Sequence, residues 1–293
     1  MDVIDRELQL SGLRMHVRDW GGEGQAVVLV HGLASNARIW DLTAPYMIAA
    51  GLRVVAVDQR GHGQTDKPIE GYDYATITSD LRAAVVSLRL KRPVVVGHSW
   101  GASVAVSYAV AHPSEVEAIV LLDGGFFDMS SSMTWEQAEV RMAPPDLTRL
   151  TPEEFLERAR TWGGALVWDE PTTAAVMGNF FVASDGRLRP HLSRENHMRI
   201  LRAMYDEPAI TMLQRVECPV LLAPSMQAGK APDDGFLARK RDAVERALAA
   251  VPQAEVRWFE DTIHDVPLQR PKELAETIVA FAARVFGAAA ENR

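Results

Sequence analysis

The sequence predicts a mostly parallel, doubly wound α/β sheet, and three observations support this prediction. Continuous apolar runs such as Ala26–Val30 and Ala118–Leu122 recur along the chain, as is typical of strands buried on both faces of a parallel sheet. Helical patterns such as Asp80–Leu88, with apolar residues three and four apart, separate these runs, and such alternation favours parallel strands. The alternation stops over residues 125–212 and then resumes, which indicates an insertion into the sheet.

The composition is that of an ordinary globular protein, and it excludes several classes of function. Of the 293 residues, 47% are hydrophobic and 24% are charged, so the chain has enough apolar surface to fold. The net charge of −8 and the pI near 5.5 argue against binding to nucleic acids or anionic membranes, which requires a basic face. The single cysteine, Cys218, permits neither an internal disulfide nor a cysteine-based zinc cluster.

The N-terminal sequence and the hydropathy pattern bear on localisation. Residues 1–7 are acidic and lack the apolar core of a signal peptide. No apolar run approaches the ~18 residues of a membrane span. We therefore expect a cytoplasmic protein without stable membrane insertion, a monomer or homodimer whose partner is a small molecule.

Eight strands and four helices account for the part of the chain that alternates. The predicted strands are Glu7–Leu10, Leu13–Val17, Ala26–Val30, Arg53–Val57, Pro93–Val96, Ala118–Leu122, Val220–Leu222 and Glu255–Phe259. The predicted helices are Asp80–Leu88, Gly101–Ala111, Phe236–Ala249 and Lys272–Val285. Residues 1–124 and 213–293 are accordingly predicted to form one core domain.

Residues 125–212 are predicted to form a helical cap inserted after the sixth strand. Their sequence gives four helical patterns and no convincing strand. These patterns are Thr134–Arg141, Thr151–Trp162, Pro171–Phe181 and Ser193–Tyr205. Thr151 followed by proline is typical of a capped helix start. We expect this segment to cover one end of the sheet.

The sharpest chemical motif is Gly97-His98-Ser99-Trp100-Gly101, which lies between an apolar strand and a helix rich in small residues. A sharp strand-to-helix turn holds its central serine in a strained conformation and exposes the hydroxyl. The helix start directs backbone N–H groups toward a developing oxyanion. Ser99 is therefore the predicted nucleophile.

A serine nucleophile needs a base and an oxyanion hole. Among the eight histidines, His264 lies in a predicted loop between the last strand and the last helix, at the edge where the crevice of such a sheet opens. His264 is therefore the predicted base. His31-Gly32 ends another buried strand, and the Leu33 N–H is predicted to form the oxyanion hole with that of Trp100.

These motifs together resemble the α/β-hydrolase fold, in its capped esterase, lipase and peroxidase-like branch. The matching segments are His31-Gly32, residues 58–63 (Asp-Gln-Arg-Gly-His-Gly), the motif around Ser99, and His264, in family order. The resemblance implies a serine hydrolase without a metal or organic cofactor. Because the dehalogenase and epoxide-hydrolase branches have aspartate at the position of Ser99, those activities are not expected.

The carboxylate that orients the base is left open between two places in the sequence. In most family members it follows the strand after the cap, but here the first acids in that region, Asp233 and Asp234, come late. Some relatives use the end of the strand before the cap, where this chain has Asp123. An aspartate that ends a buried strand must find a hydrogen-bonding partner, and His264 could supply it. Asp123 is the preferred candidate, with Asp234 and then Asp233 as alternatives.

Methionine and aromatic side chains are frequent in the predicted cap, and such side chains suit an apolar acyl or aryl pocket. They are Met129, Met133, Met142, Met177, Met198, Met204, Trp135, Trp162, Trp168, Phe180 and Phe181. The candidate pocket residues are His98, Trp135, Trp162, Met177, Phe180 and Phe181. The alternative is that most of these side chains only pack the cap onto the core.

The predicted function is hydrolysis of carboxylic esters, or lactones, that carry an apolar moiety. The same catalytic groups also support C–C bond hydrolysis, perhydrolysis or hydroxynitrile cleavage, because one fold hosts many reactions. A ligand-binding receptor or sensor that turns over slowly is a further alternative from another class of protein.

Overall fold

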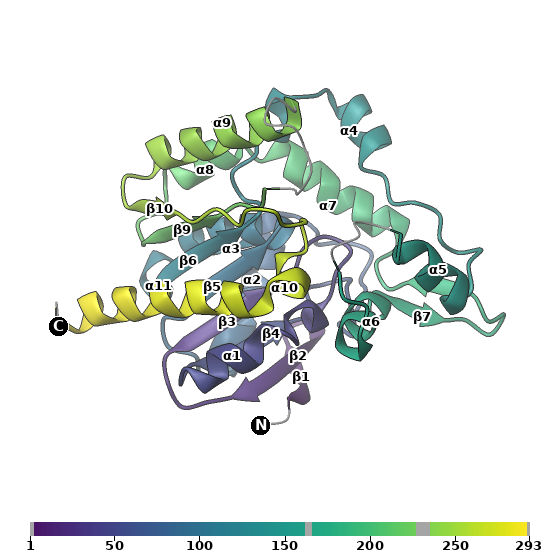
Figure 1. The fold of residues 1–293 in the computed structure, drawn as a ribbon, viewed down its shortest axis with the longest axis horizontal. Helices are drawn as coiled ribbons and strands as arrows, with labels where there is room; N and C mark the ends of the chain where they lie inside the picture. The colour runs from purple at the N-terminus through teal and green to yellow at the C-terminus, as the bar shows by residue number, and fades with distance from the viewer. Residues whose placement is uncertain (1–2, 162–165, 227–234, 292–293) are drawn as a thin grey trace.

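The computed structural model describes residues 3–161, 166–226 and 235–291, and in these residues an eight-stranded sheet lies between two layers of helices (Figure 1). Its strands are β1 (Ile4–Leu10), β2 (Leu13–Gly21), β3 (Ala26–Val30), β4 (Arg53–Val57), β5 (Val94–His98), β6 (Ala118–Leu122), β9 (Val220–Ala223) and β10 (Ala254–Val256). Across the sheet they follow the order β1-β2-β4-β3-β5-β6-β9-β10. β2 pairs antiparallel with β1 and β4, and the remaining pairs are parallel. The predicted, mostly parallel sheet is confirmed.

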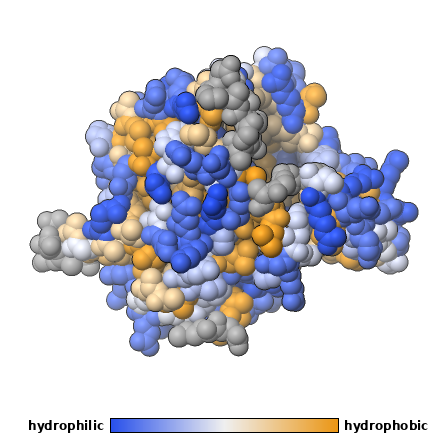
Figure 2. All heavy atoms as spheres, viewed as in Figure 1, coloured by the Kyte–Doolittle hydropathy of each residue, from blue (hydrophilic) through white to orange (hydrophobic). Residues whose placement is uncertain are grey.

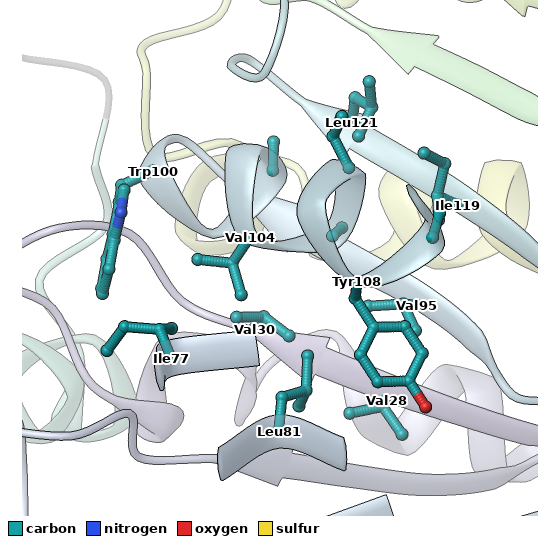
Figure 3. Close-up of a cluster of buried hydrophobic side chains, with 14 of the residues drawn as sticks. Val28, Val30, Ile77, Leu81, Val95, Trp100, Val104, Tyr108, Ile119 and Leu121 are labelled. Atoms are coloured by element: carbon teal, nitrogen blue, oxygen red, sulfur yellow. The ribbon is translucent and has the colours of Figure 1, made fainter. Parts of the chain in front are cut away.

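Neighbouring side chains of the central strands face different helical layers. Val28 and Val30 of β3 pack in a core with α2 (Tyr74–Ser87), α3 (Trp100–Ala111) and α9 (Gly235–Ala250). Val27 and Leu29 face the opposite core, with α1 (Ala44–Ala49) and α11 (Pro271–Glu291). Figure 3 shows part of the first core, with α2 and α3 beside the strands. Because each strand buries both faces, its sequence is a continuous apolar run.

The shorter elements outside the region between β6 and β9 are η1 (Ala37–Trp40), η2 (Pro113–Glu115) and α10 (Val266–Gln269). β10 is shorter than the predicted strand over Glu255–Phe259. Phe259 instead forms an isolated parallel bridge with Ser225, beyond the end of β9. The chain after β10 thus stays beside the chain after β9 and carries His264 toward the same edge of the sheet.

The chain between β6 and β9 forms helices and one small hairpin beside the sheet. Its elements are η3 (Met129–Ser131), α4 (Trp135–Arg141), α5 (Pro152–Ala159), α6 (Glu170–Met177), β7 (Phe180–Val182), β8 (Leu188–Pro190), α7 (Arg194–Asp206) and α8 (Ala209–Leu213). α5, α6 and β7 project to one side of the sheet, at the right of Figure 1. In Figure 2 the visible face of this projection is mostly hydrophilic.

One part of this region differs from the sequence prediction. The helix predicted over Pro171–Phe181 ends at Met177, and Phe180 and Phe181 lie in β7, which pairs antiparallel with β8. Gly186 has a φ of 76°, a left-handed conformation that glycine adopts without steric cost, in the turn between the two strands. Each strand has three residues, which is too short for a recognisable alternation of apolar and polar positions.

Two asparagine side chains join this region to the part of the chain that carries the sheet. Asn36, which precedes η1, donates from Nδ2 to the backbone oxygen of Ala175 at 2.9 Å and to Oδ1 of Asn179 at 2.6 Å. Asn196, at the start of α7, donates to the hydroxyl oxygen of Tyr72 at 2.7 Å. Both asparagines are buried, so these hydrogen bonds fix the position of α6 and α7.

None of the helices in the described residues is long and apolar enough to cross a bilayer. The cytoplasmic location and the monomeric or dimeric state expected from the sequence stay predictions.

Candidate active site

Ser99 lies at the turn from β5 into α3, in a strained backbone conformation with φ 55° and ψ −120°. The glycines on either side of it are required by close backbone packing. A Cβ atom on Gly97 would lie 2.1 Å from the carbonyl oxygen of Gly101, and one on Gly101 would lie 2.4 Å from that of Val30. The backbone N–H of Ser99 donates to the carbonyl oxygen of Leu122 at 2.8 Å, and this hydrogen bond holds the turn against the end of β6. The geometry is that expected of a nucleophile elbow.

The loop after β3 lies directly against this turn. A Cβ atom on Gly32 would be 3.0 Å from Cβ of Ser99, a tight contact that would require a small shift, so the glycine suits this close approach. Leu33 follows Gly32 and packs, half-buried, against the core. Trp100 is the first residue of α3 and lines the cavity beside Ser99. Of the two residues predicted to supply the oxyanion-hole amides, Trp100 thus directly follows the serine in the chain, and Leu33 follows the glycine that lies against it.

His264 and Asp123 are joined by a hydrogen bond of 2.6 Å between Nδ1 of the ring and Oδ2 of the carboxylate. Asp123 follows β6 directly and has a φ of 49°, in the left-handed region. His264 comes from the loop between β10 and α10, and its side chain remains 49% exposed. Both side chains, together with Ser99, line one cavity. The three residues predicted as a triad are thus brought together from three separate parts of the sheet edge.

Asp123 accepts hydrogen bonds on both carboxylate oxygens, and its side chain is only 3% exposed. Oδ2 accepts from His264 and from the hydroxyl of Ser225 at 2.6 Å. Oδ1 accepts from the backbone N–H of Ser225 at 2.9 Å and from Nζ of Lys240 at 2.7 Å. A buried carboxylate with this many donors is held ionised and in one orientation.

The electrostatic setting favours a charged pair between these two groups. Burial alone raises the pKa of Asp123, but the hydrogen bond and charge of His264, with the charge of Lys240, outweigh it and hold that pKa well below its usual range. Burial alone lowers the pKa of His264, but the hydrogen bond and charge of Asp123 outweigh it and raise that pKa above the ordinary 6.5. The imidazolium form of His264 is therefore stabilised, as general acid–base work requires.

His98 packs against the loop that carries His264 and is not among the residues that line the cavity. Its Nε2–H donates to the backbone oxygen of His264 at 3.0 Å, and the two ring centroids are 4.7 Å apart. Complete burial, followed by the nearby charge of His264, lowers the pKa of His98 to about 4, so its ring is neutral. His98, which the sequence predicts as a substrate-pocket residue, is thus not among the residues that line this cavity, because its side chain contacts the backbone of the His264 loop.

The cavity beside Ser99 has a volume of about 950 Å³ and lies between α3, the chain after β6, α8 and α9. Many of the side chains that line it are apolar. Five methionines line it, namely Met129, Met133, Met142, Met204 and Met212, together with Tyr74, Trp100, Phe127 and Phe236. Four of the methionines that suggested an apolar pocket are among these residues. Met212 and Phe236 were not among the residues singled out in the sequence.

The other candidate pocket residues that the structure describes lie away from this cavity. Met177 and Phe180 pack with Phe155 in a separate small cluster. Trp135 lies against Tyr205, with ring centroids 5.5 Å apart. Phe181 is exposed. None of these four residues is among those that line the cavity beside Ser99.

Three further candidates, Trp162, Asp233 and Asp234, lie outside the described residues. Among the residues that are described, no group of three or more histidine, cysteine, aspartate or glutamate side chains is arranged to hold a metal ion.

Sequence reasoning missed two groups that contact Asp123, namely Ser225 and Lys240. Ser225 follows β9, and a serine in such a segment carries no signal of its own in the sequence. Lys240 lies in α9 on the same face as Leu237, Val244 and Ala247, at spacings of three and four, and all four residues are buried. A lysine on the apolar stripe of a helix is the signal that could have identified it.

Comparisons with known proteins identify the family of this chain. The sequence model of the alpha/beta hydrolase family matches residues 27–277. The chain belongs to this family of hydrolases, which confirms the resemblance found in its motifs.

The similarity extends to individual proteins and structures. An uncharacterized protein of Mycobacterium bovis is 31% identical over 270 residues, which cover 90% of this chain and 77% of that protein. An AB hydrolase superfamily protein of Bacillus subtilis is 33% identical over 102 residues, 34% of this chain and 38% of that protein, so this match spans less than half of either. The crystal structure of E-2-(acetamidomethylene)succinate hydrolase superposes with a TM-score of 0.78 at 22% identity, covering 96% of this chain and 100% of that one.

Proposed function

We propose that this protein is a serine hydrolase that cleaves carboxylic esters or lactones with an apolar acyl or alcohol part. The observation that carries the proposal is the 2.6 Å hydrogen bond from His264 to the buried Asp123, beside a cavity that Ser99 also lines. A carboxylate, an imidazole and a strained serine in one cavity are the groups that acyl transfer to serine requires.

The reaction proceeds through an acyl-enzyme. Oγ of Ser99 attacks the ester carbonyl while Nε2 of His264 takes the hydroxyl proton. Asp123 keeps the ring in the tautomer with the proton on Nδ1 and stabilises the imidazolium. The backbone N–H groups of Leu33 and Trp100 bind the negative oxygen of the tetrahedral intermediate.

The intermediate then collapses, and His264 gives its proton to the leaving alcohol oxygen. In the second half of the reaction a water loses a proton to His264 and attacks the acyl carbonyl. The ester bond to Ser99 breaks, Oγ regains its proton, and the carboxylic acid leaves. Each proton is thus returned, and the enzyme ends in its starting state.

The character of the cavity supports an apolar substrate. Methionine side chains are flexible and polarizable, so a wall built from them adapts to acyl chains of different shape. A volume of about 950 Å³ lies at the upper end of the range of small-molecule pockets. An acyl or aryl group that extends from Ser99 toward Met129 and Met212 would therefore be bound by dispersion and the hydrophobic effect.

A fluorophosphonate probe tests the nucleophile directly. We expect a single covalent adduct on Ser99, identified by peptide mass spectrometry, and no adduct in Ser99→Ala. An unlabelled wild-type protein that is folded by circular dichroism would rule out the proposed chemistry.

A pair of matched variants tests the acid. On p-nitrophenyl butyrate, Asp123→Asn should lose about 10⁴-fold in kcat, because the neutral amide no longer enforces the correct tautomer. Asp234→Asn should retain wild-type turnover. The opposite pattern would assign the acid to Asp234.

A substrate panel separates the reactions that the same groups support. It contains p-nitrophenyl esters of increasing chain length, lactones, and 1,3-diketones, which report C–C bond hydrolysis. We expect kcat/KM to rise with acyl length for the esters. A preference for the diketones would replace ester hydrolysis with C–C cleavage as the function.

A further inference from the structure

Lys240 is a buried lysine that contacts the proposed triad acid and has no part in the mechanism above. Its side chain is 6% exposed. Nζ donates to Oδ1 of Asp123 at 2.7 Å, to the backbone oxygen of Ser225 at 3.0 Å and to the Ser225 hydroxyl oxygen at 3.2 Å. All three ammonium protons therefore have an acceptor.

A buried lysine needs such partners, because moving an ammonium group out of water costs free energy unless the group is paired and hydrogen-bonded. Among the residues that the structure describes, Asp123 and Ser225 meet that requirement for Lys240. The lysine also lies on α9, the helix that forms one wall of the cavity through Phe236 and Ala243. It therefore connects this wall to the carboxylate behind His264.

Lys240 and His264 bind different oxygens of Asp123, whereas Ser225 donates to both. Lys240 contacts Oδ1, while His264 contacts Oδ2. A cation on one oxygen fixes the rotation of the carboxylate, which aims the other oxygen at the ring. It also neutralises part of the negative charge that the ring experiences.

We propose that Lys240 is a positioning residue of the proposed triad, which orients Asp123 toward His264 and makes His264 a weaker base than Asp123 alone would make it. This inference rests on the proposed function, since it assigns a role to Lys240 through Asp123 and His264.

Within residues 3–161, 166–226 and 235–291, charged and titratable groups from four segments act on His264. Asp123 follows β6 and raises the pKa of His264, as does Asp265 of the same loop, whereas Lys240 of α9 lowers it. His98 of β5 packs under the ring and is neutral at working pH, because burial lowers its pKa to about 4. Lys240 is therefore the cation whose removal should make His264 more basic.

The test compares Lys240→Met, which removes the charge but keeps the chain length, with Lys240→Arg, which retains the charge. Lys272→Met is the matched control, because it removes the same charge from an exposed lysine of α11. The readout is the pH dependence of Ser99 labelling by a fluorophosphonate. In that step Oγ of Ser99 bonds to phosphorus, the P–F bond breaks, fluoride leaves, and neutral His264 takes the hydroxyl proton.

In Lys240→Met, we expect the midpoint of the acidic limb of the labelling-rate profile to rise by roughly one pH unit. It should stay at the wild-type value in Lys240→Arg and Lys272→Met, whatever their absolute rates. A merely structural role for Lys240 would lower the labelling rate at every pH without moving the midpoint, and that result would overturn the inference.

A measurement on the wild-type protein covers the case in which Lys240→Met does not fold. Coupling between two charges is reciprocal, so the ¹⁵N resonance of the Lys240 ammonium should inflect at the titration midpoint of His264. A Lys240 signal that does not respond at that pH would contradict the proposal. Failure of the proposed function has a different signature, namely the absence of Ser99 labelling in the wild-type protein.

Discussion

The substitution Asp123→Asn should lower both activity and stability, for two different reasons. The amide cannot hold His264 in its working tautomer, which costs about 10⁴-fold in kcat. The same change leaves the buried Lys240 ammonium without its counter-ion, and breaking a buried ion pair on one side costs about 3–5 kcal/mol. Since native domains are stable by only about 5–15 kcal/mol, this is a large share of the free energy of unfolding.

The double variant Asp123→Asn/Lys240→Met separates these two effects. It removes the stranded charge and replaces it with an apolar chain of similar length, so most of the lost stability should return. Activity should not return, because the carboxylate is still missing. The coupling free energy between the two sites is the change in unfolding free energy of the double variant minus the sum of the changes in the two single variants.

The assay is urea unfolding followed by circular dichroism, together with kcat/KM on p-nitrophenyl butyrate. A loss of 3–5 kcal/mol corresponds to a fall in Tm of roughly 6–20 °C for a domain of this size. The reasoning fails if Asp123→Asn is as stable as the wild type, or if the double variant is no more stable than Asp123→Asn. Recovery of activity in the double variant would show that Asp123 is not the acid.

Three further predictions concern other parts of the molecule. The acidic limb of the kcat/KM profile should have its midpoint above pH 6.5, because the raised pKa of His264 means that the base is protonated, and activity lost, as the pH falls through that value. Gly97→Ala should abolish Ser99 labelling and destabilise the fold. The control is Gly287→Ala, because a Cβ atom there would have nothing within 4 Å. In urea unfolding this control should be neutral or should stabilise α11 by up to about 1 kcal/mol. Asn36→Ala should lower the free energy of unfolding by about 1–3 kcal/mol and speed amide hydrogen exchange in α6, since it removes the two hydrogen bonds that the Asn36 side chain donates to Ala175 and Asn179. Unchanged exchange in α6 would refute that anchoring role.

The sheet could be predicted well from the sequence because its strands carry an unusually clear signal. Strands β3, β4 and β6 coincide with the predicted runs, since four or five consecutive apolar residues fit a strand buried on both faces and little else at that length. The hairpin of β7 and β8 was not predicted. Its strands are short and partly exposed, so they leave no such run in the sequence.

The residues proposed for catalysis could be located because each follows a strand, Ser99 and Asp123 directly and His264 in the loop after β10. The glycines around Ser99, the turn after β6 and the loop before α10 all mark one edge of the sheet, where the structure brings Ser99, Asp123 and His264 to one cavity. Their roles stay a proposal that the experiments above address.

The walls of the cavity could not be predicted in the same way. Which side of a short helix faces the substrate depends on how that helix packs against its neighbours, and that is a tertiary property. Trp135 and Phe180 turn toward other side chains of their own region, and Lys240 carries a side chain that is normally solvated.

The register between β6 and β9 has a consequence for how this protein can be altered. Leu122, the last residue of β6, is paired with Ala223, the last of β9, so the chain leaves and rejoins the sheet in neighbouring strands. Everything between them is topologically one long crossover connection. The entropy of closing such a connection changes only slowly with its length. We therefore expect that the corresponding segment of another hydrolase could be grafted between these two strands while the sheet and the turn at Ser99 keep their geometry.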